Sequence, residues 1–330
     1  MSKKERMLRA LRREPVDRLP TQSNYTGKMG RLLAAHFGIA EAELPQRLGN
    51  HLLRVDIDHL RRKNADGSIE FDWWGAGWDT RTEGYWHAFA PLKDSLDLDR
   101  YAWPDPHDAA IPEHGEDCFI APNLGICLFE RAWSLRGFDA LLMDMVERTE
   151  WVEELLDRIA EIQAALAGRF VAAGVAGGYF GDDYGAQRAM LFSPKLWRRL
   201  IKPRLAKLFA VFTDAGLPVI LHSDGDIRAI LPDLVEIGMT TLNPVQPEVL
   251  DHAWLRREYG AKMSFYGGIS TQGVLPNGTV EEVRAATVAC ARTLAPDGTG
   301  LVLGASHRMQ SDIPARNVEA MLDAFDQIGR

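Results

Sequence analysis

From about residue 115 onward the chain repeats one unit, in which a short apolar run leads through a polar turn into a helical pattern. The runs GGYFG, LPVIL and GLVLG are continuously apolar, as expected for strands buried on both faces. No hairpin turn such as Asn-Gly joins alternating strands, so the pattern predicts a parallel α/β fold. The periodicity leaves a barrel and an open doubly wound sheet as alternatives. No GxGxxG or P-loop follows an early strand, which disfavours nucleotide binding.

Composition narrows the class of protein. The 330 residues are 46% hydrophobic and 25% charged, as in ordinary globular proteins, and one α/β barrel with insertions can have this length. Three cysteines without a CxxC pair indicate a reducing compartment rather than a disulfide framework. The N-terminal residues lack the apolar stretch of a secretory signal and no run is long enough to span a membrane, so we expect a cytoplasmic protein. A net charge of −8 without a basic tract disfavours nucleic acid as a partner.

Some helix boundaries can be predicted from the sequence. A first helix is predicted over residues 3–13, with Met7 and Leu11 on its apolar face. Ser193 is followed by a proline, as at an N-cap, and Thr279 and Glu282 have the spacing of a capping box.

Polar side chains gather directly after the predicted strands. In a parallel α/β fold these positions are the carboxyl ends of the strands, where ligand sites form. The residues are Asp182, Asp183, His222, Asp224, Asn243, Gln246 and His307.

His222 and Asp224 are two residues apart, so in extended backbone both project to the same side. With His307 from a later strand they can form a three-ligand metal site that leaves positions open for substrate. In the alternative interpretation, His222 is a buried hydrogen-bonded histidine and Asp224 caps the helix that follows. Asp182 and Asp183 are adjacent, so one would reach the pocket while the other caps a helix or pairs with a nearby arginine.

A cluster of tryptophans lies in FDWWGAGWDTRTEGYW, residues 71–86. These rings could form an aromatic wall for a flat substrate. They could equally pack the interior of an N-terminal subdomain.

The chain contains RREPVDRLP, GDDYGAQRAMLFSPKLWRRLIKPR, HSDGDIRAILPDLVEIGMTTLNPVQPEV, FYGGISTQGVLPNGTVEEV and GASHRMQSDIPARNV. Together these segments resemble the uroporphyrinogen decarboxylase superfamily, and most closely its corrinoid-dependent methyltransferase and O-demethylase branch. The resemblance covers nearly the whole chain and is most specific from 178 to 317. It implies a single (β/α)8 TIM-barrel domain over 1–330. Residues 1–110 would hold the N-terminal helices, the first strand and lid insertions, and 111–330 most of a closed barrel.

The chain departs from the family pattern in two places. Uroporphyrinogen decarboxylases carry an N-terminal arginine pair for the substrate's carboxylates, but the equivalent stretch here is PTQSNYTGKMGRLL. Because eight carboxylates call for such cations, porphyrinogen decarboxylation is disfavoured. Methyltransferases of this branch that use thiols bind zinc through His-x-Cys and a distant Cys. The matching positions here are His222, Asp224 and His307, which implies a divalent metal, zinc by default, although this ligand set also suits iron.

The resemblance therefore predicts methyl transfer from a small O-methylated donor, such as a methoxylated aromatic, to cobalamin carried by a partner corrinoid protein. That partner would dock over the barrel mouth, and a homodimer is one alternative for the oligomeric state. The metal would activate the ether oxygen as leaving group. Competing hypotheses are a metal-free decarboxylase or other lyase, and a non-enzymatic barrel that senses a ligand or corrinoid. The remaining expected site residues are Asp182, Asp183 and Tyr184 for catalysis, and Asn243, Gln246, Tyr266 and Trp74 for substrate binding.

Overall fold

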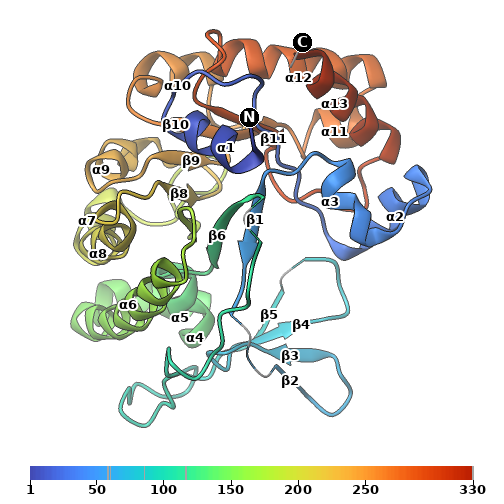
Figure 1. Cartoon of the computed structure of the whole chain (residues 1–330). Coiled ribbons are helices and arrows are strands. Elements are labelled where there is room, and N and C mark those ends of the chain that lie inside the picture. Colours follow the sequence, from blue (N-terminus) through green and yellow to red (C-terminus); the bar gives the residue numbers. More distant parts are fainter. Residues whose placement is uncertain (58, 60, 85, 116, 329–330) are drawn as a thin grey trace.

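The computed structural model describes residues 1–57, 59, 61–84, 86–115 and 117–328. Its central element is a curled, seven-stranded parallel sheet of order β1-β6-β7-β8-β9-β10-β11 (Figure 1). The order follows the sequence, so each strand lies beside the next one along the chain, as the strand–helix alternation predicts. The strands are β1 (Leu52–Val55), β6 (Phe119–Leu124), β7 (Gly178–Gly181), β8 (Val219–His222), β9 (Thr241–Asn243), β10 (Ser264–Ile269) and β11 (Leu301–Ala305).

The extended segment around Thr21 connects the two edge strands of this sheet. Thr21 forms isolated parallel bridges to Asn50, which precedes β1, and to Leu303 of β11. The backbone N–H of Gln22 donates to the Leu303 carbonyl at 3.0 Å. Gly304 permits this approach, because a side chain there would collide with the carbonyl oxygen of Gln22. The parallel fold is confirmed, but the eighth regular strand expected for a closed barrel is not present in the described residues.

Helix α1 (Lys3–Leu11) covers the amino ends of the strands. Its predicted face is confirmed, because Met7 and Leu11 are buried in one cluster with Leu52 and Phe119, the first residues of β1 and β6. The helix ends two residues earlier than expected, at Leu11. With this end filled by apolar side chains, the carboxyl end is the one available for a ligand.

The remaining helices connect the strands and cover the outer face of the sheet (Figure 1). The predicted capping box forms between Thr279 and Glu282, and Ser193 accepts a hydrogen bond from the Leu196 N–H as expected of an N-cap. The helices after β6 are α4 (Phe129–Arg136), α5 (Phe138–Glu147), α6 (Thr149–Ala172), α7 (Pro194–Leu200), α8 (Lys202–Thr213), α9 (Leu231–Glu236), α10 (His252–Tyr259), α11 (Val274–Asn277), α12 (Val280–Leu294) and α13 (Ala315–Ile328). Between α1 and β1 lie α2 (Gly27–Phe37), η1 (Glu41–Glu43) and α3 (Leu44–Arg47), and the short helix η2 (Arg228–Ile230) precedes α9.

A second sheet, which the sequence did not predict, lies apart from the first one (Figure 1). It is antiparallel, in the order β2 (Arg62–Lys63), β3 (Ile69–Phe71), β4 (Gly77–Asp79) and β5 (Trp86–Phe89). Its strands are two to four residues long, too short to show a clear alternation of apolar and polar side chains. The register between β4 and β5 also shifts next to Gly77.

The tryptophans of this region mostly pack against the protein's own interior. The ring of Trp78 meets His87 and Trp133 edge to face, at centroid distances of 5.4 and 6.1 Å. Trp74, expected to bind substrate, is 5% exposed and belongs to the main hydrophobic core. Trp86 is the exception, with 64% of its surface exposed.

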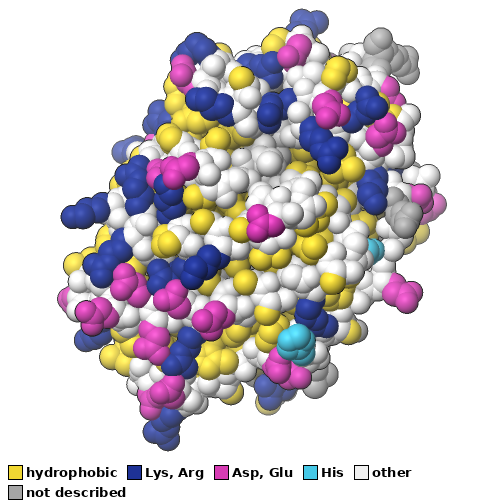
Figure 2. All heavy atoms as spheres, turned by 60° about the vertical axis from the view of Figure 1, so that its left-hand side comes forward, with side chains coloured by type: hydrophobic (Ala, Val, Ile, Leu, Met, Phe, Trp, Pro, Cys, Tyr) yellow, Lys and Arg dark blue, Asp and Glu magenta, His cyan; other side chains and the backbone are white. Residues whose placement is uncertain are grey.

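Acidic and basic side chains are intermixed on the face shown in Figure 2. On the helical layer, Asp233 of α9 pairs with both Arg198 and Lys202, at 2.9 and 2.8 Å. No helix of the described ranges is both long and apolar enough to cross a bilayer.

Candidate functional site

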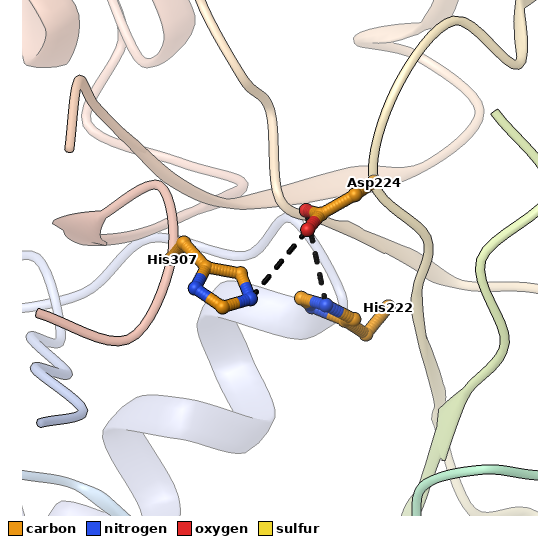
Figure 3. Close-up of side chains that lie close together, drawn as sticks. All are labelled: His222, Asp224 and His307. Carbon is orange, nitrogen blue, oxygen red and sulfur yellow. Dashed lines mark ion pairs between the residues drawn. The ribbon is translucent and has the colours of Figure 1, made fainter. Parts of the chain in front are cut away.

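His222, Asp224 and His307 lie together after the carboxyl ends of β8 and β11 (Figure 3). Nε2 of His222 is 3.8 Å from one carboxylate oxygen of Asp224, and Nε2 of His307 is 3.5 Å from the other. One ligand atom from each residue lies within 4.8 Å of the others. Two donor atoms on a tetrahedral zinc, each ~2.1 Å from the metal, are about 3.4 Å apart, so the spacing suits a bound divalent cation. We call these three residues the trio.

Asn243, at the end of β9, determines which ring nitrogen of His222 faces the other two members of the trio, Asp224 and His307. Its amide Nδ2 donates to the carbonyl oxygen of Tyr266 at 3.2 Å, and a carbonyl can only accept. The amide oxygen must therefore face Nδ1 of His222, at 2.7 Å, and it also accepts from the Tyr179 hydroxyl at 2.9 Å. His222 thus carries its proton on Nδ1 and presents the Nε2 lone pair to Asp224 and His307, the arrangement typical of a metal-binding histidine.

The backbone around Asp224 is held by the loop that follows β7. Asp183 accepts a hydrogen bond from the Asp224 N–H at 2.8 Å. Gly185 and Gly225 bring the two loops into backbone contact, since a Cβ at Gly185 would lie 2.8 Å from the Asp224 carbonyl oxygen. The alternative role of Asp224 as a helix cap is wrong, because the helix that follows, η2, has Ile227 as its N-cap residue and no side-chain cap. The Arg228 N–H at its start donates to Asp226 instead.

Asp182 occupies a structural position behind the site. Its fully buried carboxylate accepts three backbone N–H groups at the start of α4, from Leu128, Phe129 and Glu130, at 2.7 to 3.2 Å. The hydroxyl of Tyr184, also fully buried, donates to it at 2.7 Å. Burial raises the pKa of Asp182 to about 6, against the effect of these hydrogen bonds. Asp182 and Tyr184, expected as catalytic residues, therefore support α4, whereas Asp183 is the aspartate next to the trio, 3.9 Å from Nε2 of His222.

Carboxyl groups crowd this end of the sheet. Burial raises the pKa of Asp183; His222 partly offsets the shift and Asp224 reinforces it. Burial, together with the charges of Asp183, Asp182 and Asp224, raises the pKa of Glu130 well above its usual range. Glu130 therefore keeps its proton to higher pH than an ordinary glutamate, which is the condition for a proton donor near neutral pH.

A cavity of about 450 Å³ opens beside the trio. Gln246, expected to bind substrate, lines it and accepts from the Gly225 N–H at 3.4 Å. Tyr266 does not line it, because this side chain is 1% exposed within the sheet and its hydroxyl accepts from Asn24. The lining residues are Asp224, Gln246, Thr271, Gln272, Pro276, Asn277, Ser306, His307, Arg308, Gln310, Asp312 and Ile313.

Comparison with known protein families shows which family the chain belongs to. The family model for uroporphyrinogen decarboxylase (URO-D) matches residues 129–328, more than half of the sequence. The chain belongs to the URO-D family. None of the curated protein sequences compared with it matches.

The comparison with solved structures covers nearly the whole chain of this URO-D family protein, beyond the residues that the family model matches. A methyltransferase from Methanosarcina mazei superposes with a TM-score of 0.74 at 22% identity, covering 99% of both chains, which shows a shared fold. An amidohydrolase (TM-score 0.37, 10% identity, 94% of this chain and 69% of the other) is too distant to carry an argument. The same holds for an N-acetyl-D-glucosamine-6-phosphate deacetylase from Mycobacterium smegmatis (TM-score 0.24, 13% identity, 46% of this chain and 45% of the other).

Two charged residues of this URO-D family site were missed in the sequence. Glu130 lies in the first turn of α4 rather than after a strand, so the strand-end criterion did not reach it. Arg308 directly follows His307 and lines the cavity, and its position beside an expected ligand was the signal that could have identified it.

Proposed function

We propose that this URO-D family protein transfers a methyl group from a small O-methylated donor to the cobalt of a corrinoid protein. The observation that carries the proposal is the trio, with the His222 lone pair oriented by Asn243 toward Asp224 and His307. The fold shared with a methyltransferase and the family membership support it. The corrinoid partner would dock over the carboxyl ends of the strands, where the cavity opens.

The residues present fit a divalent cation, zinc by default. Two imidazole nitrogens and one carboxylate oxygen can occupy three positions and leave the others for substrate. A cation held there would supply Lewis acidity toward the ether oxygen of the donor. The set contains no thiolate, so its chemistry suits an oxygen leaving group rather than a thiol.

The chain's own residues have separate roles in this proposal. His222 and His307 hold nitrogen lone pairs toward the site, and Asp183 fixes the backbone of Asp224 by accepting its N–H. Reduced cobalt is itself a strong nucleophile, so the protein needs to orient the donor and stabilise the leaving group rather than activate the attacking atom.

The test is methyl transfer to free cob(I)alamin and to a reduced corrinoid protein, followed by methyl-cobalt absorbance, with a panel of methoxylated donors. We expect transfer with the wild type and loss of both metal and turnover in His222→Ala. His36→Ala is the matched control, because this exposed histidine pairs with Glu319 on the helical surface. An inert panel with both acceptors, together with loss of carboxyl groups from uroporphyrinogen, would show that the protein is a decarboxylase instead.

A further inference from the structure

The loop after β11 carries His307, the most exposed member of the trio. The side chain of His307 is 43% exposed, against 34% for Asp224 and 20% for His222. Its place therefore depends on how the backbone to either side is held. Before it, the Ser306 N–H donates to the Ile269 carbonyl at 2.7 Å. After it, the loop runs beside the N-terminal segment, to which Met309 forms a parallel bridge.

Glu83, between β4 and β5, attaches this loop to the antiparallel sheet. One oxygen of its carboxylate accepts from the Ser311 N–H at 3.1 Å and from the hydroxyl of Thr26, the N-cap residue of α2. The other oxygen accepts from the Ser311 hydroxyl at 2.6 Å. Ser311 is four residues after His307. A single carboxylate thus joins the antiparallel sheet, the N-terminal segment and the loop that carries the third member of the trio.

The charge of Glu83 makes these hydrogen bonds stronger. Burial raises the pKa of Glu83, but the hydrogen bonds from Ser311 and Thr26 and the charge of Lys28 outweigh it, so the pKa lies below its usual value. Hydrogen bonds to an ionised carboxylate are about twice as strong as those between neutral groups. The bonds to Ser311 are also partly buried, which limits their screening by salt.

The antiparallel sheet gives Glu83 a fixed base. Asp72, which follows β3, pairs with Arg131 of α4 at 2.6 Å. His87 of β5 donates from Nε2 to the Ser134 carbonyl of the same helix at 2.8 Å. The sheet is therefore attached to α4, which follows β6, and through Glu83 to the loop that follows β11.

We propose that Glu83 is a positioning residue of the metal site, which holds the loop after β11 so that His307 faces the other two members of the trio. This inference rests on the proposed function, because it concerns the metal site on which that function depends. The same contact shapes the cavity, since the residues on both sides of Ser311, Gln310 and Asp312, line it. Coupling between two sites is reciprocal. If Glu83 strengthens metal binding, bound metal must strengthen the attachment of the antiparallel sheet by the same factor.

The first measurement is zinc affinity, by competition with a chromophoric chelator and without donor or corrinoid. We expect Glu83→Ala to bind zinc about 5- to 100-fold more weakly than the wild type. Glu83→Gln keeps one acceptor oxygen and should retain part of the affinity. Glu70→Ala is the matched control, because this glutamate of β3 pairs with Arg61 at 2.9 Å within the antiparallel sheet. It should leave the zinc affinity unchanged.

The second measurement is hydrogen–deuterium exchange of the peptide of residues 77–84, which contains β4 and Glu83. Saturating zinc should slow the exchange of this peptide in the wild type, by a factor similar to the loss of affinity in Glu83→Ala. In Glu83→Ala the effect of zinc should disappear. A residue that only stabilised the fold would not transmit the binding of zinc to this peptide.

Equal zinc affinity of Glu83→Ala and the wild type, or exchange of the wild-type peptide that does not respond to zinc, would overturn the inference. A wild type that binds no zinc would overturn it too. If Glu83→Ala does not fold, the response of the wild-type peptide to zinc and the affinity of Glu83→Gln decide the question. Neither measurement involves turnover, so failure of the proposed function is seen separately, as coupled zinc binding with no methyl-cobalt formed.

Discussion

Replacement of Asn243 by leucine tests whether the orientation of His222 matters for metal binding. Leucine keeps the approximate volume of the side chain but removes three hydrogen bonds, to His222, Tyr179 and the Tyr266 carbonyl. Since Asn243 is 5% exposed, the groups it leaves behind find little water. Each unsatisfied buried group costs about 1–3 kcal/mol, so we expect the free energy of unfolding to fall by roughly 3 kcal/mol or more.

The functional effect of this change is separable from its effect on stability. Loss of a group that orients a ligating histidine typically lowers metal affinity about 10- to 100-fold. We expect a fall of that size for zinc, measured by competition with a chromophoric chelator. Gln163→Leu serves as control, because Gln163 of α6 is a buried amide that donates to the Cys127 carbonyl rather than to a segment that carries the trio. It should reduce stability without changing metal affinity.

The reasoning is refuted if Asn243→Leu binds zinc as tightly as the wild type while His222→Ala loses it. His222 would then bind the metal without needing Asn243 to fix its ring.

Two further predictions concern backbone contact and pH. Gly185→Ala should lower both the zinc affinity and the melting temperature, because the new Cβ would lie 2.6–2.8 Å from the backbone of residues 224–226. The control is Gly168→Ala, whose Cβ meets nothing within 4 Å. This change should leave both quantities intact or raise the melting temperature slightly. A similar response of both variants would contradict the role given to this contact. Burial, with Arg6 adding to it, lowers the pKa of His51 to about 4. Between pH 4 and 6.5 the unfolded chain therefore binds more protons at His51 than the folded one. The free energy of unfolding of the wild type should thus fall by up to about 3 kcal/mol as the pH drops through this window. His51→Gln should remove this part of the pH dependence in urea unfolding; an unchanged slope would rule out His51 as its source.

The sequence was most informative where a residue's position in a strand fixed its direction. His222 and Asp224 project to the same side because they are two apart at the end of a strand, and this geometry could be predicted from the two letters and the apolar run before them. His307 was predicted from its place at the end of a later apolar run and supported by the family resemblance, although its position opposite the other two depends on how β11 sits in the sheet. The parallel order of the strands followed from the alternation alone.

The sequence was least informative where distant segments determine a residue's role. Asp182 and Asp183 are neighbours, but one supports a helix that begins more than fifty residues earlier and the other holds Asp224. Asn243 looked like a substrate ligand until its three partners were known. Periodicity describes which face a side chain occupies, whereas these roles depend on which other segment meets that face.

The segment around Thr21 affects the order in which parts of the protein fold. Its continuation reaches the loop that carries His307, where the Met309 N–H donates to the Asn24 carbonyl and the Thr26 N–H to the Met309 carbonyl, at 2.8 and 3.0 Å. These contacts join residues almost three hundred positions apart, and pairings of such separation form late because a long loop must close first. A growing chain can assemble His222 and Asp224 well before its last strand exists. The third member of the trio acquires its support only when the two ends of the protein meet, so capacity to bind metal should appear as the final event of folding.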